Sequence, residues 1–495
     1  KFPEYKGLNL PNVAKEMLKY WEDNNIFEKS VTSREGSKPF VFFEGPPSAN
    51  GLPGVHHVLA RAIKDIFPRY KTMKGFQVKR KAGWDTHGLP IELGVEKELG
   101  ITKEDIGKTI SVEEYNAACR KAVMRYTDIW NHLTQKMGYW VNMDDPYITY
   151  EPKYMESVWW LLKEIYEKNL MYKGYTIQPY SPKAGTGLSS HELNQPGTYQ
   201  DVTDTTVTAQ FKALEKTLPD FLQNEGSIYF LAWTTTPWTL PSNTALTVGP
   251  KIDYVLVNTF NQYTFEPVKV ILAKNLVGKQ FGAKNNVEVE NEDELLEYTP
   301  GDKNIPFFVG KEFVGKDLVG IKYEQLLPYV LPNDNPQDAF RVISGDFVTT
   351  EDGTGIVHTS PTFGADDAMV AKQASPEIPP MLIKDENDNL VPLVDLQGKF
   401  VKELGEFGGK YVKNEYYKDG EAPEKSIDVE LAIKLKEENK AFKVEKYKHS
   451  YPNCWRTDKP ILYYPLDSWF IKVTDVKERM FDLNQTINWK PKSTG

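Results

Sequence analysis

The feature that most constrains the fold of this chain is a Gly/Pro-rich loop, GPPSANGLPGVHH, at residues 45–57. It follows the apolar run at 40–43 and precedes apolar residues that recur at helical spacing. The run predicts a strand buried on both faces of a parallel sheet, so the stretch predicts strand, loop and helix. A helix N-terminus offers unpaired backbone N–H groups to an anion, and His56 and His57 add imidazoles beside it. The sequence therefore predicts a nucleotide-phosphate site and enzyme chemistry on ATP.

The composition is that of a globular enzyme. Hydrophobic residues make up 40% of the 495 residues and charged residues 26%, with a net charge of -9. The length predicts two or three domains. No apolar stretch approaches the roughly 20 residues that a membrane span needs, so we expect no membrane role and a cytoplasmic location. Cys119 and Cys454 lie far apart in the sequence, which argues against a disulfide framework and favours a reducing compartment.

The pattern of apolar and turn residues changes twice along the chain and divides it into three parts. Helical patterns at 111–138 and 153–168 would flank the sheet of the first part. From about residue 200, short β-type runs separated by turn residues predict a mostly β domain, with strands expected at 227–233, 254–257, 269–273, 340–344 and 354–359. A helix at 428–440 and a strand at 443–447 lead back to sequence that resembles the first part. We expect domains at 1–199, 200–440 and 441–495, the middle one being inserted, in a chain cut from a longer protein.

A second motif, GWDTHGLPIE, occupies residues 83–92. Asp85 could hold the ammonium group of a ligand through a charge-assisted hydrogen bond. Alternatively the segment only starts a helix, with Asp85 or Thr86 as the cap, Pro90 near the first helical position and Glu92 in the first turn. The presence of the first loop in the same chain favours the ligand.

Together the two motifs resemble those of the class I aminoacyl-tRNA synthetases, and within them the isoleucyl group. The family patterns are Gly-Pro-Pro-x-Ala-Asn-Gly before a His-x-Gly-His segment, and Gly-Trp-Asp-x-His-Gly-Leu-Pro-x-Glu. This chain matches both except in the His-x-Gly-His segment. The resemblance implies an α/β fold: the first half of a Rossmann-like parallel-sheet catalytic domain, with an inserted, mostly β editing domain. It implies that Asp85 holds the amino group of isoleucine, that Pro46 lines its side chain, and that residues 54–57 lie against ATP.

One departure lies at the centre of this match. The family pattern is His-x-Gly-His, whereas this chain has Gly54, Val55, His56 and His57, so the first and third positions are exchanged. An imidazole at position 56 must either turn away from the nucleotide or replace the histidine that position 54 lacks. We interpret the chain as an active variant in which Gly54, His56 and His57 bind ATP and the two imidazoles are catalytic. A weakened synthetic site is the alternative.

The middle domain carries two further strings of interest. A Thr-rich run from 234 to 236 precedes Pro-Trp and can aim hydroxyl groups at a ligand, although threonine is also common in strands. Much later, GTGIVH at 353–358 is followed by the acid pair Asp366 and Asp367, which could anchor an ammonium group or simply be solvated. Alone, neither string is specific.

Both strings resemble the two sides of the editing pocket in this family. The resemblance implies that Asp367 binds the amino group of a mischarged aminoacyl end and that His358 narrows the pocket against isoleucine. The residues that would hold the terminal adenosine and a water are Thr234, Thr235, Thr236 and Asn243. One methylene group is worth only about 1–3 kcal/mol of discrimination, and this family is the usual example of why a second hydrolytic sieve is needed.

Many relatives carry four cysteines that could bind zinc, at positions where this chain has Ser181, Ala184, Cys454 and Thr457. One remaining thiolate cannot form a closed tetrahedral site, so we expect no structural zinc here. His191 and His449 are expected to be ordinary polar or packing residues.

The resemblance implies an isoleucine–tRNA ligase that uses ATP with Mg²⁺, isoleucine and tRNA(Ile), edits valyl-tRNA(Ile), and acts as a monomer. The second half of the catalytic sheet is not present in the sequence. Three alternatives therefore stay open: a fragment competent only in editing deacylation, a valyl or leucyl relative, and a non-catalytic tRNA-binding relative.

Overall fold

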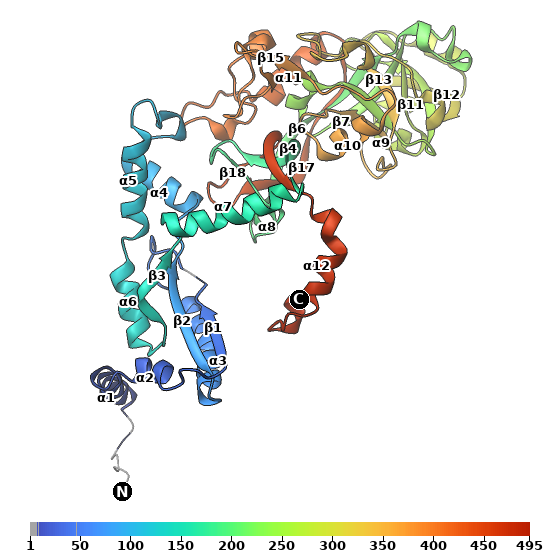
Figure 1. Cartoon of the computed structure of the whole chain (residues 1–495). Helices are drawn as coiled ribbons and strands as arrows, with labels where there is room; N and C mark the ends of the chain where they lie inside the picture. Colours follow the sequence, from blue (N-terminus) through green and yellow to red (C-terminus); the bar gives the residue numbers. More distant parts are fainter. Residues whose placement is uncertain (1–6, 8, 46) are drawn as a thin grey trace. The chain divides into compact units, whose positions relative to one another are not determined.

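The computed structural model describes residues 7, 9–45 and 47–495 and divides the chain into two compact units. The first unit contains residues 1–172 and 471–495, and the second contains 173–470. Each unit has its own elements, many of which are labelled in Figure 1. The predicted fold class is confirmed, since one unit is built on a parallel sheet and the other is mostly β.

The first unit is an α/β assembly. Its parallel sheet has the order β1 (Pro39–Phe43), β2 (Gln77–Trp84) and β3 (Asn142–Ile148). The helices are α1 (Leu10–Asp23), α2 (Ile26–Thr32), α3 (Val55–Met73), α4 (Leu89–Leu99), α5 (Val112–Val123), α6 (Thr127–Lys136), α7 (Pro152–Glu167) and α12 (Lys477–Asn484). Strand, loop and helix thus follow one another at residues 39–73, as the sequence predicts.

Two local expectations need correction. The prediction that β1 is buried on both faces is wrong, because Val41 and Phe43 are 57% and 60% exposed. Phe40 points toward α3, where Lys71 lies 5.5 Å from its ring centroid, whereas on the other face Phe43 packs edge-on against Tyr147 at 6.0 Å and stays largely exposed. The helical pattern at 111–138 forms two helices, because the backbone N–H of Tyr126 bonds the carbonyl of Ala49 in the loop.

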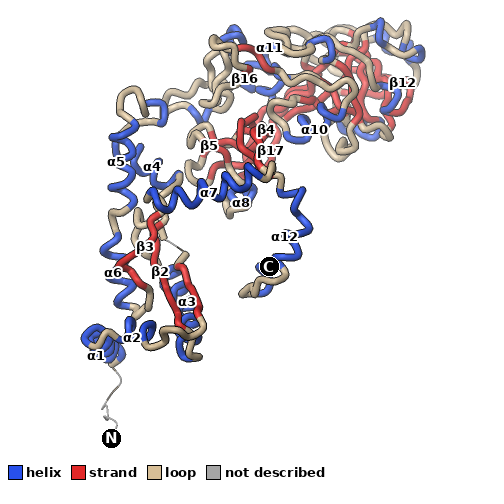
Figure 2. The backbone as a smooth tube through the Cα atoms, viewed as in Figure 1, coloured by secondary structure: helices blue, strands red, loops and turns tan. Residues whose placement is uncertain are grey.

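The second unit is dominated by strands, drawn red in Figure 2. Its main sheet has the order β11-β12-β9-β10-β7-β14-β8-β13, and β6 joins β7 to β17. These strands are β6 (Tyr199–Lys212), β7 (Ile228–Thr234), β8 (Ala245–Val248), β9 (Asp253–Phe260), β10 (Pro267–Ala273), β11 (Asn286–Glu288), β12 (Ile305–Val314), β13 (Arg341–Ser344), β14 (Ile356–Thr359) and β17 (Ala441–Cys454). All five strands predicted in the middle of the chain are therefore present.

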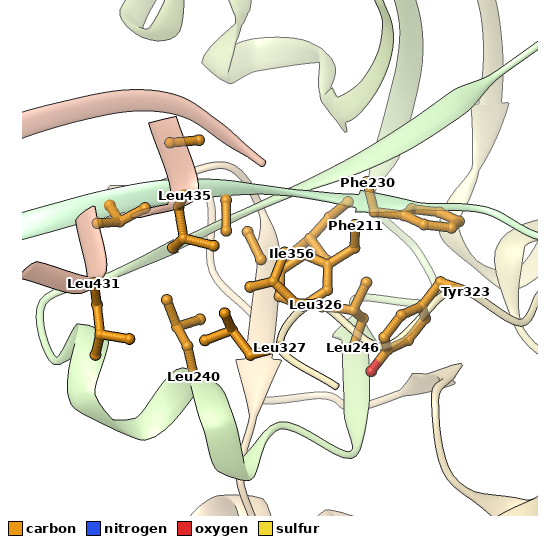
Figure 3. Packing of buried hydrophobic residues seen from close by; sticks show 14 of the residues in the cluster. Phe211, Phe230, Leu240, Leu246, Tyr323, Leu326, Leu327, Ile356, Leu431 and Leu435 are labelled. Atoms are coloured by element: carbon orange, nitrogen blue, oxygen red, sulfur yellow. The ribbon is translucent and has the colours of Figure 1, made fainter. Parts of the chain in front are cut away.

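Smaller elements complete this unit. Its remaining strands are β4 (Met171–Ser181), β5 (Thr186–Gly187), β15 (Leu382–Lys384), β16 (Leu390–Pro392), β18 (Lys459–Pro460) and β19 (Leu462–Ile471). Its α-helices are α8 (Ser190–Leu193), α9 (Val277–Gln280), α10 (Ala365–Gln373) and α11 (Ile427–Glu437), and η4 (Pro237–Ser242) is one of several short 3-10 helices. Figure 3 shows part of its buried core, where Leu240 of η4 lies among Leu327, Leu431 and Leu435.

A two-stranded stem frames the middle of the chain. β6 and β17 pair antiparallel, in a register that runs from Tyr199 opposite Pro452 to Ala209 opposite Ala441. The segment of residues 213–440 therefore begins at the end of β6 and ends at the start of β17, the strand paired with β6.

Candidate functional site

The Gly/Pro-rich loop lies between β1 and α3, and contacts from elsewhere in the first unit hold it in place. Three of its carbonyl groups accept hydrogen bonds: Pro47 from the Asp85 N–H (2.9 Å), Ala49 from the Tyr126 N–H (3.0 Å) and Gly51 from the Trp130 indole N–H (2.9 Å). These donors come from the end of β2 and from the start of α6 and the residue before it. The loop therefore has a defined path to the N-terminus of α3, and Pro46 within it lies outside the described residues.

The two adjacent histidines form a ring pair in the first turn of α3. Gly54 caps the helix, and its backbone N–H donates to Nδ1 of His57 at 2.9 Å, so a neutral His57 carries its proton on Nε2. The ring centroids of His56 and His57 are 3.8 Å apart, and the His57 ring packs edge-on against Trp130 at 4.7 Å. Burial lowers the pKa of His57, and the neighbouring His56 and Arg61 lower it further. His57 is thus held as a neutral donor.

The exchanged positions in the loop are sterically linked. A Cβ atom placed on Gly54 would lie 2.7 Å from Cε1 and 2.9 Å from Nδ1 of His56. Contacts this short do not occur between real atoms, so the His56 ring fills the space that a side chain at position 54 would need. Glycine at 54 and histidine at 56 are therefore compatible with each other, and the imidazole is folded back toward the loop.

Asp85 lies at the carboxyl end of β2 and is exposed. The alternative in which Asp85 or Thr86 caps α4 is not observed, because Gly88 is the capping residue and has no side-chain bond to offer. Thr86 and His87 instead bond the hydroxyl of Thr149, at 2.8 Å and 2.9 Å. The carboxylate of Asp85 remains accessible to a ligand beside the loop that its own backbone N–H anchors.

A buried acid that the sequence motifs did not indicate lies directly before the loop. Glu44 is only 3% exposed, and its carboxylate bonds Lys64 Nζ at 2.6 Å and the hydroxyl of Tyr139. Its backbone carbonyl accepts from the Tyr147 hydroxyl. The sequence contains one signal for this acid, since Glu44 directly follows the apolar run. A carboxylate buried at such a position needs hydrogen-bonding or charged partners.

In the second unit, strand pairing brings the two predicted editing strings together. β7 and β14 are adjacent and parallel, with Trp233 opposite Val357. Thr234 and His358 follow these two residues, so both lie at the same end of neighbouring strands. Thr234 is buried and accepts the backbone N–H of Thr236 at 3.1 Å, whereas Thr235 and Thr236 are half-buried.

A directed chain of hydrogen bonds fixes the His358 imidazole. The Tyr323 hydroxyl donates to Oδ1 of Asn243 (2.7 Å), whose amide group donates to Nδ1 of His358 (2.8 Å). Nε2 then donates to the hydroxyl of Thr239 (2.9 Å), which donates to the Thr236 carbonyl (2.8 Å). Burial lowers the pKa of His358 to about 3. His358 and Asn243 therefore use these polar atoms inside the protein, and the imidazole stays neutral.

Asp367 lies in the first turn of α10. Its carboxylate accepts the Ser360 N–H at 2.8 Å and folds over Gly364, where an added Cβ would lie 2.7 Å from Cγ. Burial raises the pKa of Asp367 to about 7, the Ser360 N–H opposes this shift, and Asp366 adds to it. A ligand ammonium group would stabilise the ionised carboxylate, which otherwise lacks a cationic partner among the described residues.

The four positions compared with zinc ligands are largely buried, with Ser181, Ala184 and Cys454 at most 1% exposed. Within the described ranges, no group of three or more histidine, cysteine or acidic side chains is arranged to hold a metal ion. His449 pairs with Asp204, and His191 bonds Gln195. Among the helices of the described residues, none is both long and apolar enough to cross a bilayer.

Comparison with known proteins gives consistent matches. The family described as tRNA synthetases class I (I, L, M and V) matches residues 16–495. The chain is 63% identical over 500 residues to an Isoleucine--tRNA ligase of Cytophaga hutchinsonii, covering 99% of this chain and 44% of that protein. Proteins of the same name are 61% identical in Bacteroides fragilis and 57% identical in Porphyromonas gingivalis, each over 511 residues, 100% of this chain and 44% of the relative. The chain thus spans less than half the length of these relatives.

Proposed function

The chain belongs to the class I tRNA synthetases of the isoleucine, leucine, methionine and valine group, and from that premise we propose that it is part of an isoleucine–tRNA ligase. The pair of imidazoles in the first turn of α3, beside the anchored loop, is the observation that carries the proposal. The identity of 57–63% to proteins of that name supports isoleucine over valine or leucine.

In the proposed activation step, a carboxylate oxygen of isoleucine attacks the α-phosphorus of ATP, and pyrophosphate leaves. ATP enters as its magnesium complex. His56 and His57 donate hydrogen bonds to the phosphate oxygens as charge develops, next to the N-terminal N–H groups of α3. Gly54 leaves room for the His56 ring, so that residues 54–57 lie against ATP. Asp85 holds the ammonium group of isoleucine, and Pro46 lines its side chain. A ribose hydroxyl of tRNA(Ile) then attacks the carbonyl carbon, and AMP leaves.

The second proposed activity is hydrolysis of valyl-tRNA(Ile). Water attacks the ester carbonyl, the ester C–O bond breaks, and valine and free tRNA are released. Asp367 binds the ammonium group of valine, and Thr234, Thr235 and Thr236 present hydroxyl and backbone groups to the terminal adenosine and water. Asn243, which the resemblance places at the adenosine, donates its amide hydrogens to His358 and to the Ala245 carbonyl. We therefore assign it, with His358, to a rigid pocket wall that excludes isoleucine.

The proposed organisation is a catalytic domain in residues 1–199 and 441–495 with an editing domain inserted at 200–440. The pairing of β6 with β17 supports an insertion that leaves and returns at neighbouring points. We further propose a monomeric cytoplasmic enzyme without structural zinc in this part of the protein.

Two assays on the full-length protein test these activities. Isoleucine-dependent exchange of pyrophosphate into ATP should be lost in His57→Ala and reduced in His56→Ala. Normal exchange in His56→Ala would show that this imidazole does not replace the histidine that position 54 lacks. Valyl-tRNA(Ile) should be deacylated by the wild type and not by Asp367→Ala, whereas a protein without catalysis would show neither reaction.

A further inference from the structure

A cluster of buried charged groups lies in the second unit, outside the proposed contacts with substrate. Lys413 is 7% exposed, and its ammonium group lies 3.2 Å from Oδ2 of Asp204 and 3.9 Å from Oδ2 of Asp428. Nε2 of His449 lies 3.1 Å from the same oxygen of Asp204, and the Tyr451 ring lies under Lys413 at 4.8 Å. Burying these charged groups costs free energy, and the ion pairs between them offset part of that cost.

One member of the cluster connects it to the predicted editing residues. Asp428 lies in the first turn of α11, and its Oδ1 accepts the backbone N–H of Trp238 at 2.9 Å, 190 residues away in the sequence. Trp238 lies in the first turn of η4, where backbone N–H groups lack partners within the helix. The carboxylate therefore satisfies a donor at the start of η4 that is otherwise buried.

The position of η4 determines the position of the hydrolytic residues. Thr239 of η4 receives the hydrogen bond from His358, and the Trp238 ring packs against Phe363 at 5.1 Å. Phe363 lies in the segment that joins His358 to Asp367. A shift of η4 would therefore disturb both sides of the pocket.

We propose that Asp428 is a positioning residue for the hydrolytic site, which it serves by anchoring η4 through the backbone N–H of Trp238. This inference rests on the proposed editing function. Lys413 stabilises the buried carboxylate but makes no hydrogen bond or ion pair with η4 among the described residues. The essential feature is thus the acceptor oxygen of residue 428 rather than its charge.

The electrostatics of the site indicate which substitution tests the proposal. Burial raises the pKa of Asp428 to about 7, although Lys413 and the Trp238 N–H oppose the shift. Whether ionised or protonated, the group keeps an oxygen that accepts from Trp238. Asparagine has the same shape and an equivalent oxygen, whereas alanine has no acceptor.

The experiment measures deacylation of valyl-tRNA(Ile) and aminoacylation by the full-length protein carrying Asp428→Ala or Asp428→Asn. Asp428→Ala should lower kcat for deacylation by about ten- to a hundred-fold, as expected when reacting groups are displaced by about an ångström. Its aminoacylation should stay at the wild-type level, and Asp428→Asn should restore deacylation. A purely structural role would instead lower both activities in parallel with thermal stability.

Asp204→Asn is the matched control, because it changes the same cluster without touching η4, and it should deacylate like the wild type. If Asp428→Ala does not fold, the charge-balanced double variant Lys413→Met/Asp428→Asn keeps the acceptor and should remain active. Normal deacylation by Asp428→Ala, or failure of Asp428→Asn and of the double variant to deacylate, would overturn the proposal. A wild type that does not deacylate valyl-tRNA(Ile) would instead refute the editing function itself.

Discussion

At the scale of single residues, the close packing of His56 against Gly54 can be tested by substitution. Gly54→Ala places a methyl group where the His56 ring lies, 2.7 Å from Cε1, so the ring must move. We expect pyrophosphate exchange to fall about ten-fold in the full-length protein, because a displaced imidazole no longer meets the developing charge.

Gly51→Ala, in the same loop, is the control, because nothing lies within 4 Å of its added Cβ and exchange should stay normal. The double variant Gly54→Ala/His56→Gly relieves the clash but should not recover the rate, since it lacks the imidazole. Wild-type exchange in Gly54→Ala would contradict this role of His56.

Asp367 makes a prediction about pH. Because its pKa is raised to about 7, the carboxylate becomes neutral as the pH falls below that value, and its attraction for an ammonium group is lost. KM for valyl-tRNA(Ile) deacylation should therefore rise between pH 7 and pH 5.5, a range in which the amino group of valine stays protonated. Asp367→Asn should have a high KM that does not vary with pH, and a flat wild-type profile would contradict the assignment.

The raised pKa of Asp367 also makes the stability of the folded protein depend on pH. A carboxyl group whose pKa is raised by folding contributes full stability below its ordinary value of 3.8, and this contribution is lost as the pH rises through about 7. Asp367→Asn should therefore unfold at a higher temperature than the wild type at pH 8, with a smaller difference at pH 5. Calorimetry at the two pH values measures this difference.

The residue types at the two sites could be predicted from the sequence, but the hydrogen bonds between these residues could not. The loop, the motif around Asp85 and the Thr-rich run are each made of residues that are neighbours in the sequence, so they can be recognised directly. The bond between Asn243 and His358 joins residues 115 positions apart, and no periodicity predicts it. The same is true of Glu44 and Tyr139, which meet only after the sheet has formed.

At the scale of elements, α6 holds the Gly/Pro-rich loop through the indole group of Trp130. Trp130→Phe keeps an aromatic ring against His57 and Arg61 but removes the hydrogen bond to the Gly51 carbonyl. We expect a loss of about 1 kcal/mol in the free energy of unfolding. KM for ATP should also rise, because the loop is less well held.

Trp159→Phe on α7 is the matched control, since Trp159 is 61% exposed and should change neither quantity. Equal effects of the two substitutions on KM would show that the indole bond to the loop has no role in nucleotide binding.

Element types were more predictable than element boundaries and environments. The strands β7, β9, β10, β13 and β14 were recognised because branched and aromatic residues alternate with clear turn signals, whereas β8, β11 and β12 were not predicted. The break between α5 and α6 was not recognised, since it depends on Tyr126 bonding a loop more than 70 residues earlier. The exposure of Val41 and Phe43 was also missed, because an apolar run does not reveal which face of a sheet is covered.

At the scale of the whole molecule, the second unit has the features of an independently folding domain. It has its own buried core, centred on residues such as Phe211, Phe230 and Tyr323, and a continuous sheet. We expect residues 173–470, expressed alone, to unfold in one cooperative thermal transition and to resist limited proteolysis. Gradual melting, or cleavage within the main sheet, would show that the unit needs the rest of the protein.

The stem formed by β6 and β17 has a consequence for how proteins of this kind diversify. Because β6 and β17 lie side by side, the segment between them begins and ends at adjacent strands of one pair. Lengthening or shortening a connection inside the inserted part adds only a small closure entropy, which grows with the logarithm of loop length, and leaves the stem register unchanged. The connections within residues 213–440 can therefore change in length from one related protein to another while the two ends of this segment stay together.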